Sequence, residues 1–207
     1  MQLLLGTNNR GKVIEMTEVL SGLPIELLTL LQLKLRPEVE EAGTTFRENA
    51  LIKAQHFFRL SGLPTLADDS GIIVDALHEE LGVFTRRWGA GPTASDEEWI
   101  EFFLKRMKGE KNKKARFVCC LAYCDKEGTE HVFEGFCDGT ITETLEASYL
   151  PGLPISACFK PDGCSFVYSA MTIEEKNKTS HRGKAMKKVR DFLEDAQKIN
   201  HGSRTAI

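Results

Sequence analysis

The chain lacks the long apolar segments that membrane proteins carry. No run of 18 or more apolar residues occurs in its 207 residues, and no charged segment precedes a short apolar one near the N-terminus. A membrane-spanning helix needs about 20 such residues, and a secretory signal needs that order of charged and apolar parts. We therefore expect a cytoplasmic protein with no membrane partner.

The sequence also lacks paired cysteine motifs and an excess of positive charge. Its six cysteines contain no C-x-x-C pair, and Cys119, Cys120 and Cys124 fall on one predicted strand. Reduced, partly buried thiols are expected, rather than disulfides or a zinc site. A net charge of −3 does not suit binding to duplex nucleic acid, so no nucleic-acid partner is expected.

Internal repeats and low-complexity linkers are absent as well. With 42% hydrophobic residues, the chain can bury a full core as one α/β domain, which we place at residues 1–198. Residues 199–207 are expected to form a mobile tail. Strands separated by helices and strands joined by a turn both occur in the pattern, which predicts a mixed sheet.

Hydrophobic periodicity and helix caps place the secondary structure. The expected strands are 2–5, 24–30, 64–67, 72–77, 116–124, 130–137 and 140–145. The expected helices are 12–20, one capped at Thr45 that ends near residue 60, one capped at Ser95 that ends near 108, a short turn opened by Thr172, and one capped at Ser180 that ends near 198.

A cluster of polar and basic residues, Lys176, Ser180, His181 and Arg182, surrounds the start of the last helix. Free backbone N–H groups and the positive end of the helix dipole favour an anion or an acceptor-rich ligand there. A cation in the first turn is disfavoured unless a ligand compensates for it. This pattern predicts a binding edge, with a solvated polar helix start as the alternative.

The loop after the first strand fits the pattern G-x-x-x-x-G-K at Gly6–Lys12. Val13, however, follows where a phosphate loop needs a hydroxyl for magnesium, and the loop is poor in glycine. We interpret it as a pocket of side chains that donate to phosphate, with a kinase or ATPase loop and an ordinary turn as alternatives. The pocket residues would be Thr7, Asn8, Asn9 and Lys12.

Acidic residues occur where an α/β sheet commonly binds ligands. Asp68 and Asp69 follow the expected strand 64–67, and adjacent carboxylates point in different directions, so at most one is expected to enter the site directly. Acids of the preceding loop could share a magnesium ion with Asp69, but the sequence does not decide which of them does. Helix-capping acids and a solvated turn are the alternative. The loop acids are Glu38, Glu40 and Glu41, with Glu48 close after them at the start of the helix, and the opposing cations are Lys12, Lys53, Lys176 and Arg182.

Four ordered motifs, TNNRGK, EEAGTTFRENALIKA, LADDSG and EEKNKTSHRGKA, resemble the inosine triphosphatase family of noncanonical purine nucleoside triphosphate pyrophosphatases. The resemblance implies an elongated α/β fold with a long mixed central sheet flanked by helices, two lobes around a cleft, and a homodimer. It also implies magnesium-dependent hydrolysis of inosine and xanthosine triphosphates, and of their deoxy forms, to the monophosphate and pyrophosphate.

The resemblance also assigns residues to roles. Asp69 corresponds to the catalytic, metal-binding aspartate, Glu41 to a metal-binding glutamate and Lys53 to a helix residue needed for turnover. Phosphate contacts would come from Thr7, Asn8, Asn9 and Lys12, a further substrate contact from Ser70, and the base-reading edge from Lys176, Ser180, His181 and Arg182. Arg87 matches an arginine of the family without a firm role.

One motif departs from the family pattern. Where G-F-G-Y-D-P or G-F-G-W-D-P is usual, residues 152–158 have aliphatic side chains in place of both aromatics, and Ser156 in place of the carboxylate that accepts from the base. Stacking on an aromatic is worth ~1–3 kcal/mol per base. An altered or relaxed base preference, or a nucleotide-binding protein without efficient turnover, is therefore the alternative function.

Overall fold

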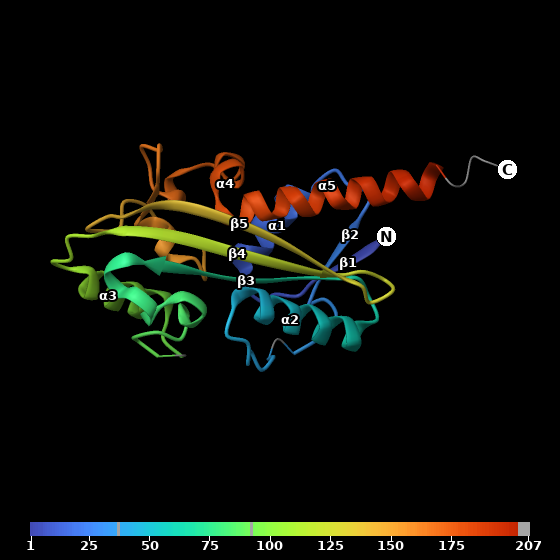
Figure 1. Cartoon of the computed structure of the whole chain (residues 1–207), viewed down its shortest axis with the longest axis horizontal. Coiled ribbons are helices and arrows are strands. Elements are labelled where there is room, and N and C mark those ends of the chain that lie inside the picture. The colour runs from blue at the N-terminus through green and yellow to red at the C-terminus, as the bar shows by residue number, and fades with distance from the viewer. Residues whose placement is uncertain (37, 92, 203–207) are drawn as a thin grey trace.

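A computed structural model describes residues 1–36, 38–91 and 93–202. It is an elongated molecule in which one twisted sheet is flanked by helices on both faces, as the sequence predicts (Figure 1). The strands are β1 (Gln2–Leu5), β2 (Glu26–Thr29), β3 (Thr65–Val74), β4 (Lys114–Cys124), β5 (Glu130–Ile141) and β6 (Phe159–Pro161). The helices are α1 (Arg10–Leu20), α2 (Phe46–Ser61), α3 (Asp96–Met107), α4 (Ile173–Thr179) and α5 (His181–Gly202).

The sheet is mixed, with the order β2-β1-β3-β4-β5-β6. β1 runs parallel to β2 and β3, while β3, β4, β5 and β6 are joined by antiparallel ladders. The ladder between β1 and β3 is short, because Leu5 pairs with Leu66 and β1 then ends. Within the described sheet, β3 therefore has an open edge beyond Leu66.

One face of β3 contributes to two separate hydrophobic cores. Leu66 packs with α1 and α5, whereas Ile72 and Val74 pack with α3. The side chains between them on that face are polar, Asp68 and Ser70, because strand residues alternate between faces. The opposite face packs on α2. The polar interruption separates the two cores and marks where a cleft can open.

Strand β3 corrects two predictions. The expected strands 64–67 and 72–77 are one continuous strand, and residues Asp75–Glu80 form a 3₁₀ helix. Asp68 and Asp69 therefore lie in the middle of a strand and not at its end. Their polar character hides the strand pattern, whereas the antiparallel ladder with β4 supplies the backbone hydrogen bonds that keep these residues extended.

The C-terminal half of the structure corrects two more predictions about secondary structure. The expected strand 140–145 does not form; β5 extends to Ile141, and the sixth strand is Phe159–Pro161. Helix α5 continues to Gly202, beyond the expected end near residue 198. Residues 203–207 of the expected tail lie outside the described residues.

The helix starts agree closely with the sequence. Capping boxes begin α2, α3 and α4 at Thr45, Ser95 and Thr172, as predicted. All six cysteines are free, which also agrees. In the described part of the chain, no helix is long and apolar enough to span a membrane.

Helix α5 lies directly against strand β5 at Gly135. A Cβ atom there would come within 2.0 Å of the carbonyl oxygen of His181 and 2.8 Å of the amide nitrogen of Ala185. The absence of a side chain at Gly135 thus allows the first turn of α5 to approach the sheet and fixes the depth of His181.

Replacing Gly135 with Ala should lower the free energy of unfolding by about 3 kcal/mol or more, because the added methyl group meets backbone that cannot rotate away. Urea unfolding measures the change. Glu134→Ala, on the other face of the same strand, is the control and should cost much less. Equal stability of the Gly135→Ala and wild-type proteins would contradict this close approach.

Candidate active site

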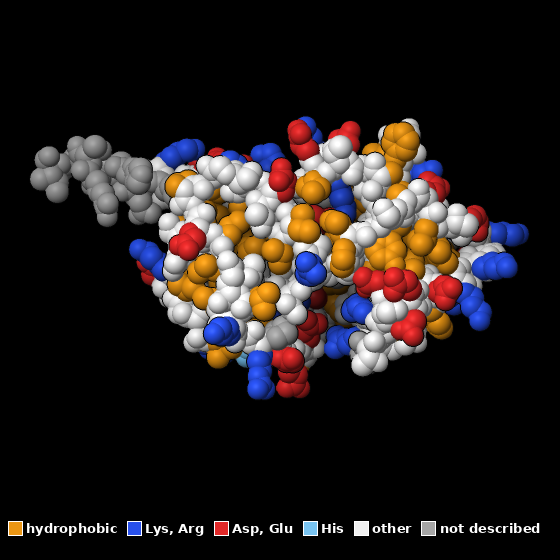
Figure 2. All heavy atoms as spheres, turned by 180° about the vertical axis from the view of Figure 1, so that it is seen from behind, with side chains coloured by type: hydrophobic (Ala, Val, Ile, Leu, Met, Phe, Trp, Pro, Cys, Tyr) orange, Lys and Arg blue, Asp and Glu red, His pale blue; other side chains and the backbone are white. Residues whose placement is uncertain are grey.

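A cleft of about 1080 Å³ lies at the open edge of β3. Its walls come from the loop after β1, the loop before α2, the middle of β3, the segment before β6 and the start of α5. Seen from behind, the surface is hollowed between the two halves of the molecule, and acidic and basic side chains both reach the hollow (Figure 2). Every predicted site residue except Ser180 lines this cleft. Ser180 is buried and caps α5, accepting a hydrogen bond from the Gly183 amide at 3.0 Å.

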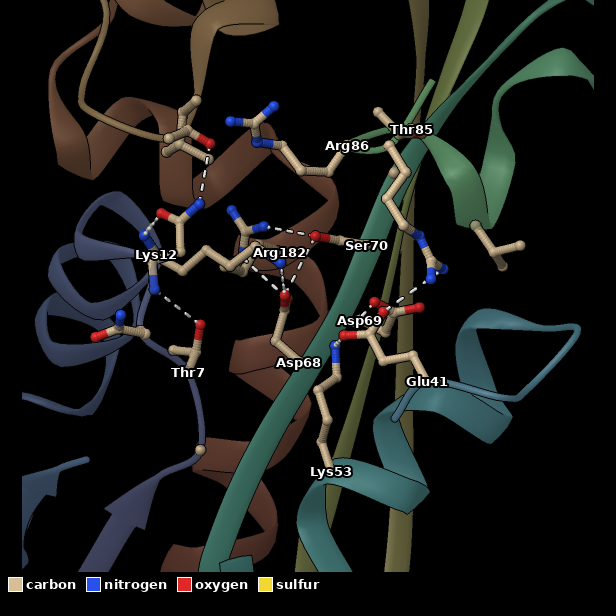
Figure 3. A pocket seen from close by; sticks show the side chains of 18 of the residues that line it. Thr7, Lys12, Glu41, Lys53, Asp68, Asp69, Ser70, Thr85, Arg86 and Arg182 are labelled. Atoms are coloured by element: carbon tan, nitrogen blue, oxygen red, sulfur yellow. Dashed lines mark hydrogen bonds and ion pairs between the residues drawn. The ribbon is translucent and has the colours of Figure 1, made fainter. Parts of the chain in front are cut away.

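Asp68 and Asp69 both reach the cleft although they leave opposite faces of β3 (Figure 3). Asp68 points toward Lys12 and Arg182, and Asp69 points toward Lys53 on α2. Because the edge of β3 is open beyond Leu66, side chains of both faces border the same space. The expectation that only one carboxylate enters the site is therefore wrong.

Asp68 is a buried anion held by two cations. Its carboxylate contacts Lys12 Nζ, accepts from Arg182 Nε at 3.2 Å, and accepts from the Cys119 thiol at 3.2 Å. Burial opposes ionisation, but Lys12 and Arg182 outweigh it and hold the pKa of Asp68 well below its usual range. Burial, together with the charge of Asp68, raises the pKa of Cys119 well above its ordinary value, so this residue stays a thiol.

Glu15 on α1 is a site residue that the sequence analysis missed. It is 1% exposed, and its two oxygens lie 2.5 Å from Lys176 Nζ and 2.5 Å from Arg182 Nη1. Burial alone would raise the pKa of Glu15, but Arg182 and Lys176 hold it below its ordinary value. One signal was available, because Glu15 lies three residues after Lys12 and therefore on the same side of the helix.

Lys53 bridges two carboxylates on the other side of β3. Its Nζ lies 2.9 Å from Asp69 Oδ1 and 3.2 Å from Glu41 Oε1. Burial alone would lower the pKa of Lys53, but the two carboxylates outweigh it and raise that pKa. For Asp69, burial raises the pKa, and Lys53 offsets it only in part. The second oxygen of Asp69, Oδ2, is buried and has no hydrogen-bond partner.

Two carboxylates of the cleft fit a magnesium ion. Among the described residues, no group of three or more His, Cys, Asp or Glu side chains forms a complete metal site. Mg²⁺ usually needs only one or two carboxylates, with water and substrate phosphate as its other ligands. Asp69 and Glu41 already share one cation, the Lys53 ammonium, and Asp69 Oδ2 is unpartnered. Glu38 and Glu40, the other two candidates, are exposed at the rim.

The loop after β1 is only partly available to phosphate. Asn9 Oδ1 accepts from the Lys12 amide at 3.1 Å and so caps α1, while Asn9 Nδ2 donates to the Gly152 carbonyl at 3.0 Å. Thr7 Oγ1 accepts from the Asn9 amide at 3.2 Å, and Asn8 is exposed. Thr7, Asn8 and Lys12 thus face the cleft with capacity for a ligand, whereas the side chain of Asn9 holds the loop in place.

The expected base-reading edge contains one unpartnered polar atom. The His181 ring stacks on Phe117 with centroids 4.5 Å apart, and its buried Nδ1 has no hydrogen-bond partner. Burial and the neighbouring Arg182 lower the pKa of His181 well below its ordinary value, so the ring is neutral. The Ser156 hydroxyl, in contrast, has hydrogen-bond partners. It donates to the Leu153 carbonyl at 2.5 Å and lies 2.6 Å from the Ser169 hydroxyl.

Arg182 is already used inside the protein. Its Nε, Nη1 and Nη2 atoms donate to Asp68, Glu15 and Ser70 respectively. It therefore organises the floor of the cleft by holding two acids and a hydroxyl. Two further residues that the sequence analysis did not assign, Thr85 and Arg86, also line the cleft (Figure 3).

Comparison with known proteins shows the family to which the chain belongs. The model of the Ham1 family matches residues 3–192. The chain belongs to the Ham1 family. The resemblance carried by the four sequence motifs is thereby confirmed.

Relatives and solved structures of the Ham1 family cover nearly the whole chain. The dITP/XTP pyrophosphatase of Leptospira interrogans is 43% identical over 192 residues, which are 93% of this chain and 96% of that protein. The dITP/XTP pyrophosphatase of Thermus thermophilus is 40% identical over 198 residues, which are 94% and 93% of the two chains. The structure of a HAM1 protein from Coxiella burnetii superposes with a TM-score of 0.80 at 30% identity and covers 94% of this chain and 99% of its own.

Replacing Glu15 with Gln should lower the free energy of unfolding by about 3 kcal/mol, because Lys176 and Arg182 each lose a charged partner while buried. Urea unfolding at pH 7 tests this. Glu18→Gln, exposed on the same helix, is the matched control and should change stability by less than about 0.5 kcal/mol. Equal effects of the two substitutions would contradict the role of Glu15.

The difference in stability between wild type and Glu15→Gln should also depend on pH. Folding lowers the pKa of Glu15, so the carboxylate stabilises the protein fully at pH values above the ordinary value of 4.5. This contribution is lost as the pH falls through the folded-state pKa. The stability difference between wild type and Glu15→Gln should therefore shrink in acid.

Proposed function

We propose that this Ham1 protein hydrolyses noncanonical purine nucleoside triphosphates, namely inosine, deoxyinosine and xanthosine triphosphate, to the monophosphate and pyrophosphate. The class of enzyme, a nucleoside triphosphate diphosphatase, is confirmed by the relatives named dITP/XTP pyrophosphatase. The proposal adds a requirement for Mg²⁺ and a physiological role in clearing such nucleotides from the cellular pool.

The observation that supports this proposal best is the environment of Asp69. Its Oδ2 atom is a buried carboxylate oxygen without a hydrogen-bond partner, and the charges of Lys53 and Lys12 both act on the group. An oxygen of this kind suits a metal ion or an attacking water molecule. The cleft also provides Lys12 on its other side, where a triphosphate would need positive charge.

The residues of the cleft account for the main steps of such a reaction. Glu41 and Asp69 would hold Mg²⁺, which supplies charge neutralisation at the phosphates. Asp69 Oδ2 would accept a hydrogen bond from the water that attacks the α-phosphorus and would take up its proton. The bond from the α-phosphorus to the bridging oxygen breaks, and pyrophosphate leaves. Lys12 and Lys53 would offset the negative charge on the phosphates.

His181 is the residue that we propose to read the base. A neutral imidazole that carries its proton on the free Nδ1 can donate one hydrogen bond to the 6-oxo group of hypoxanthine or xanthine. Adenine presents an amino group at that position, which would leave the histidine donor unpaired. Because the Ser156 hydroxyl is bonded to the Leu153 carbonyl and to Ser169, discrimination among 6-oxo purines, including guanine, should be weaker than the preference for them over adenine.

A kinase or ATPase built on Gly6–Lys12 is the competing function. Val13 packs against the core that contains Met16 and Leu20, so the position after Lys12 provides no metal ligand. The products distinguish the two functions, since the competing one yields orthophosphate or phosphoryl transfer. Nucleotide binding without hydrolysis would instead indicate a non-catalytic protein. The homodimer, the cytoplasmic location and the lack of a nucleic-acid partner stay predictions.

Asp69→Asn should lower kcat by about two orders of magnitude or more, because it removes the charge that holds Mg²⁺ and orients water, while nucleotide affinity largely survives. Pyrophosphate release from a panel of nucleoside triphosphates with Mg²⁺ measures turnover, and calorimetry measures affinity. Glu40→Gln, an exposed acid of the same rim, is the control. A folded Asp69→Asn protein with nearly normal kcat would disprove the mechanism.

His181→Phe should keep the ring that stacks on Phe117 and remove the hydrogen-bonding Nδ1. We expect the ratio of kcat/KM for inosine triphosphate to that for adenosine triphosphate to fall by about tenfold or more, since buried hydrogen bonds discriminate strongly. Inorganic tripolyphosphate, tested as an inhibitor, should bind both proteins alike. If wild type hydrolyses the two nucleotides equally well, His181 does not read the base.

A further inference from the structure

Gly152, which begins the base-side wall of the cleft, is held from two directions. Its carbonyl accepts from Asn9 Nδ2 at 3.0 Å, and its amide donates to Asp96 Oδ2 at 2.6 Å. Its φ is +81°, and a Cβ atom there would lie 2.4 Å from Asn9 Nδ2. A glycine is therefore needed at this position both for its backbone conformation and for the close contact with Asn9.

The two residues that hold Gly152 are themselves fixed to helix starts. Asn9 caps α1 through its bond from the Lys12 amide, and Asp96 is the first residue of α3. These helices belong to the two different hydrophobic cores. The contacts are distant in sequence, because Asn9 and Gly152 are 143 positions apart and Asp96 and Gly152 are 56 positions apart. Gly152 thus connects the two halves of the molecule across the end of the cleft.

The adjoining residues transmit this connection to the cleft. Leu153 packs against the first turn of α1, with its Cδ1 2.7 Å from the position that a Cβ of Gly11 would take. Pro154–Ala157 follows at once as a 3₁₀ helix, and it carries Ser156 into the wall. A shift at Gly152 would therefore move the wall that faces the base relative to Lys12, which faces the phosphates.

We propose that Asn9, Gly152 and Asp96 form a clasp that sets the distance between the base-binding wall and the phosphate-binding loop. The proposal rests on the nucleotide substrate proposed above. It makes Asn9 and Asp96 positioning residues for the reaction, and it explains why both polar atoms of the Asn9 side chain are used within the protein. A misplacement of about 1 Å can cost about a hundredfold in rate, so a clasp of this kind affects substrate selection.

Asp96→Ala tests the clasp from the side that is remote from phosphate. It removes the acceptor of the Gly152 amide and leaves the capping box of Ser95 and Glu98 that starts α3. Glu97→Ala is the matched control, because it removes the same charge from the same helical turn. In the described structure the Gly152 amide donates to Asp96 and not to Glu97, so this variant leaves the hydrogen bond in place. Asp96→Asn keeps an acceptor oxygen and is the conservative rescue.

Two measurements separate positioning from a general loss of structure. For Asp96→Ala we expect KM for inosine triphosphate to rise about tenfold, with the inhibition constant of inorganic tripolyphosphate changed less than about twofold, because only the nucleotide must span both walls. Asp96→Asn should recover most of the loss, and Glu97→Ala should match wild type. Parallel weakening of nucleotide and tripolyphosphate by Asp96→Ala would overturn the proposal.

Hydrogen exchange gives a readout that does not depend on hydrolysis. The amide of Gly152 and the segment 153–158 should exchange faster in Asp96→Ala than in Glu97→Ala or wild type. If wild type hydrolyses no nucleotide but this difference is present, the proposed function fails and the clasp remains as a structural link. If Asp96→Ala and Glu97→Ala exchange alike at Gly152, the clasp itself is wrong.

Discussion

The early end of β1 is the constraint on which the site depends. Because β1 stops at Leu5, the edge of β3 is open beyond Leu66, and a strand that would otherwise be covered borders a cleft. Asp68 and Asp69 leave opposite faces of β3 and still reach one space. The site therefore uses both faces of a single strand, with one set of cations on α1 and α5 and another on α2.

Charge balance inside the cleft follows from burial. An unpaired buried charge costs several kcal/mol, so Lys12, Lys53 and Arg182 are each paired with acids in the protein without a ligand. A triphosphate with its metal ion brings both signs of charge at once. It can therefore exchange partners with these ion pairs without leaving an isolated charge in the cleft. The pairs that Arg182 makes with Glu15 and Asp68 are almost fully buried and would stay in place in such an exchange.

Local signals in the sequence were sufficient for most helix starts, and the predicted site residues other than Ser180 lie together in one cleft. Capping boxes depend on residues three apart, and all three predicted ones form. Long-range partners were not accessible in the same way. Glu15 meets Arg182 across 167 positions, and Asn9 meets Gly152 across 143. The strand through Asp68 and Asp69 was divided in the prediction because its stability comes from the ladder with β4, which local propensity does not report.

Family membership fixes the chemistry of the phosphates more firmly than the choice of base. In the proposed mechanism the acids and lysines would act on atoms that every nucleoside triphosphate carries, so their geometry would not distinguish among bases. In the proposed complex the base would meet the other wall, where aliphatic side chains lie beside Ser156, whose hydroxyl is bonded to Leu153 and Ser169. In the proposed function, selection of the base would then rest on one hydrogen bond from a neutral His181 and on the position of this wall. Both depend on close backbone contacts, at Gly135 for the histidine and at Gly152 for the wall.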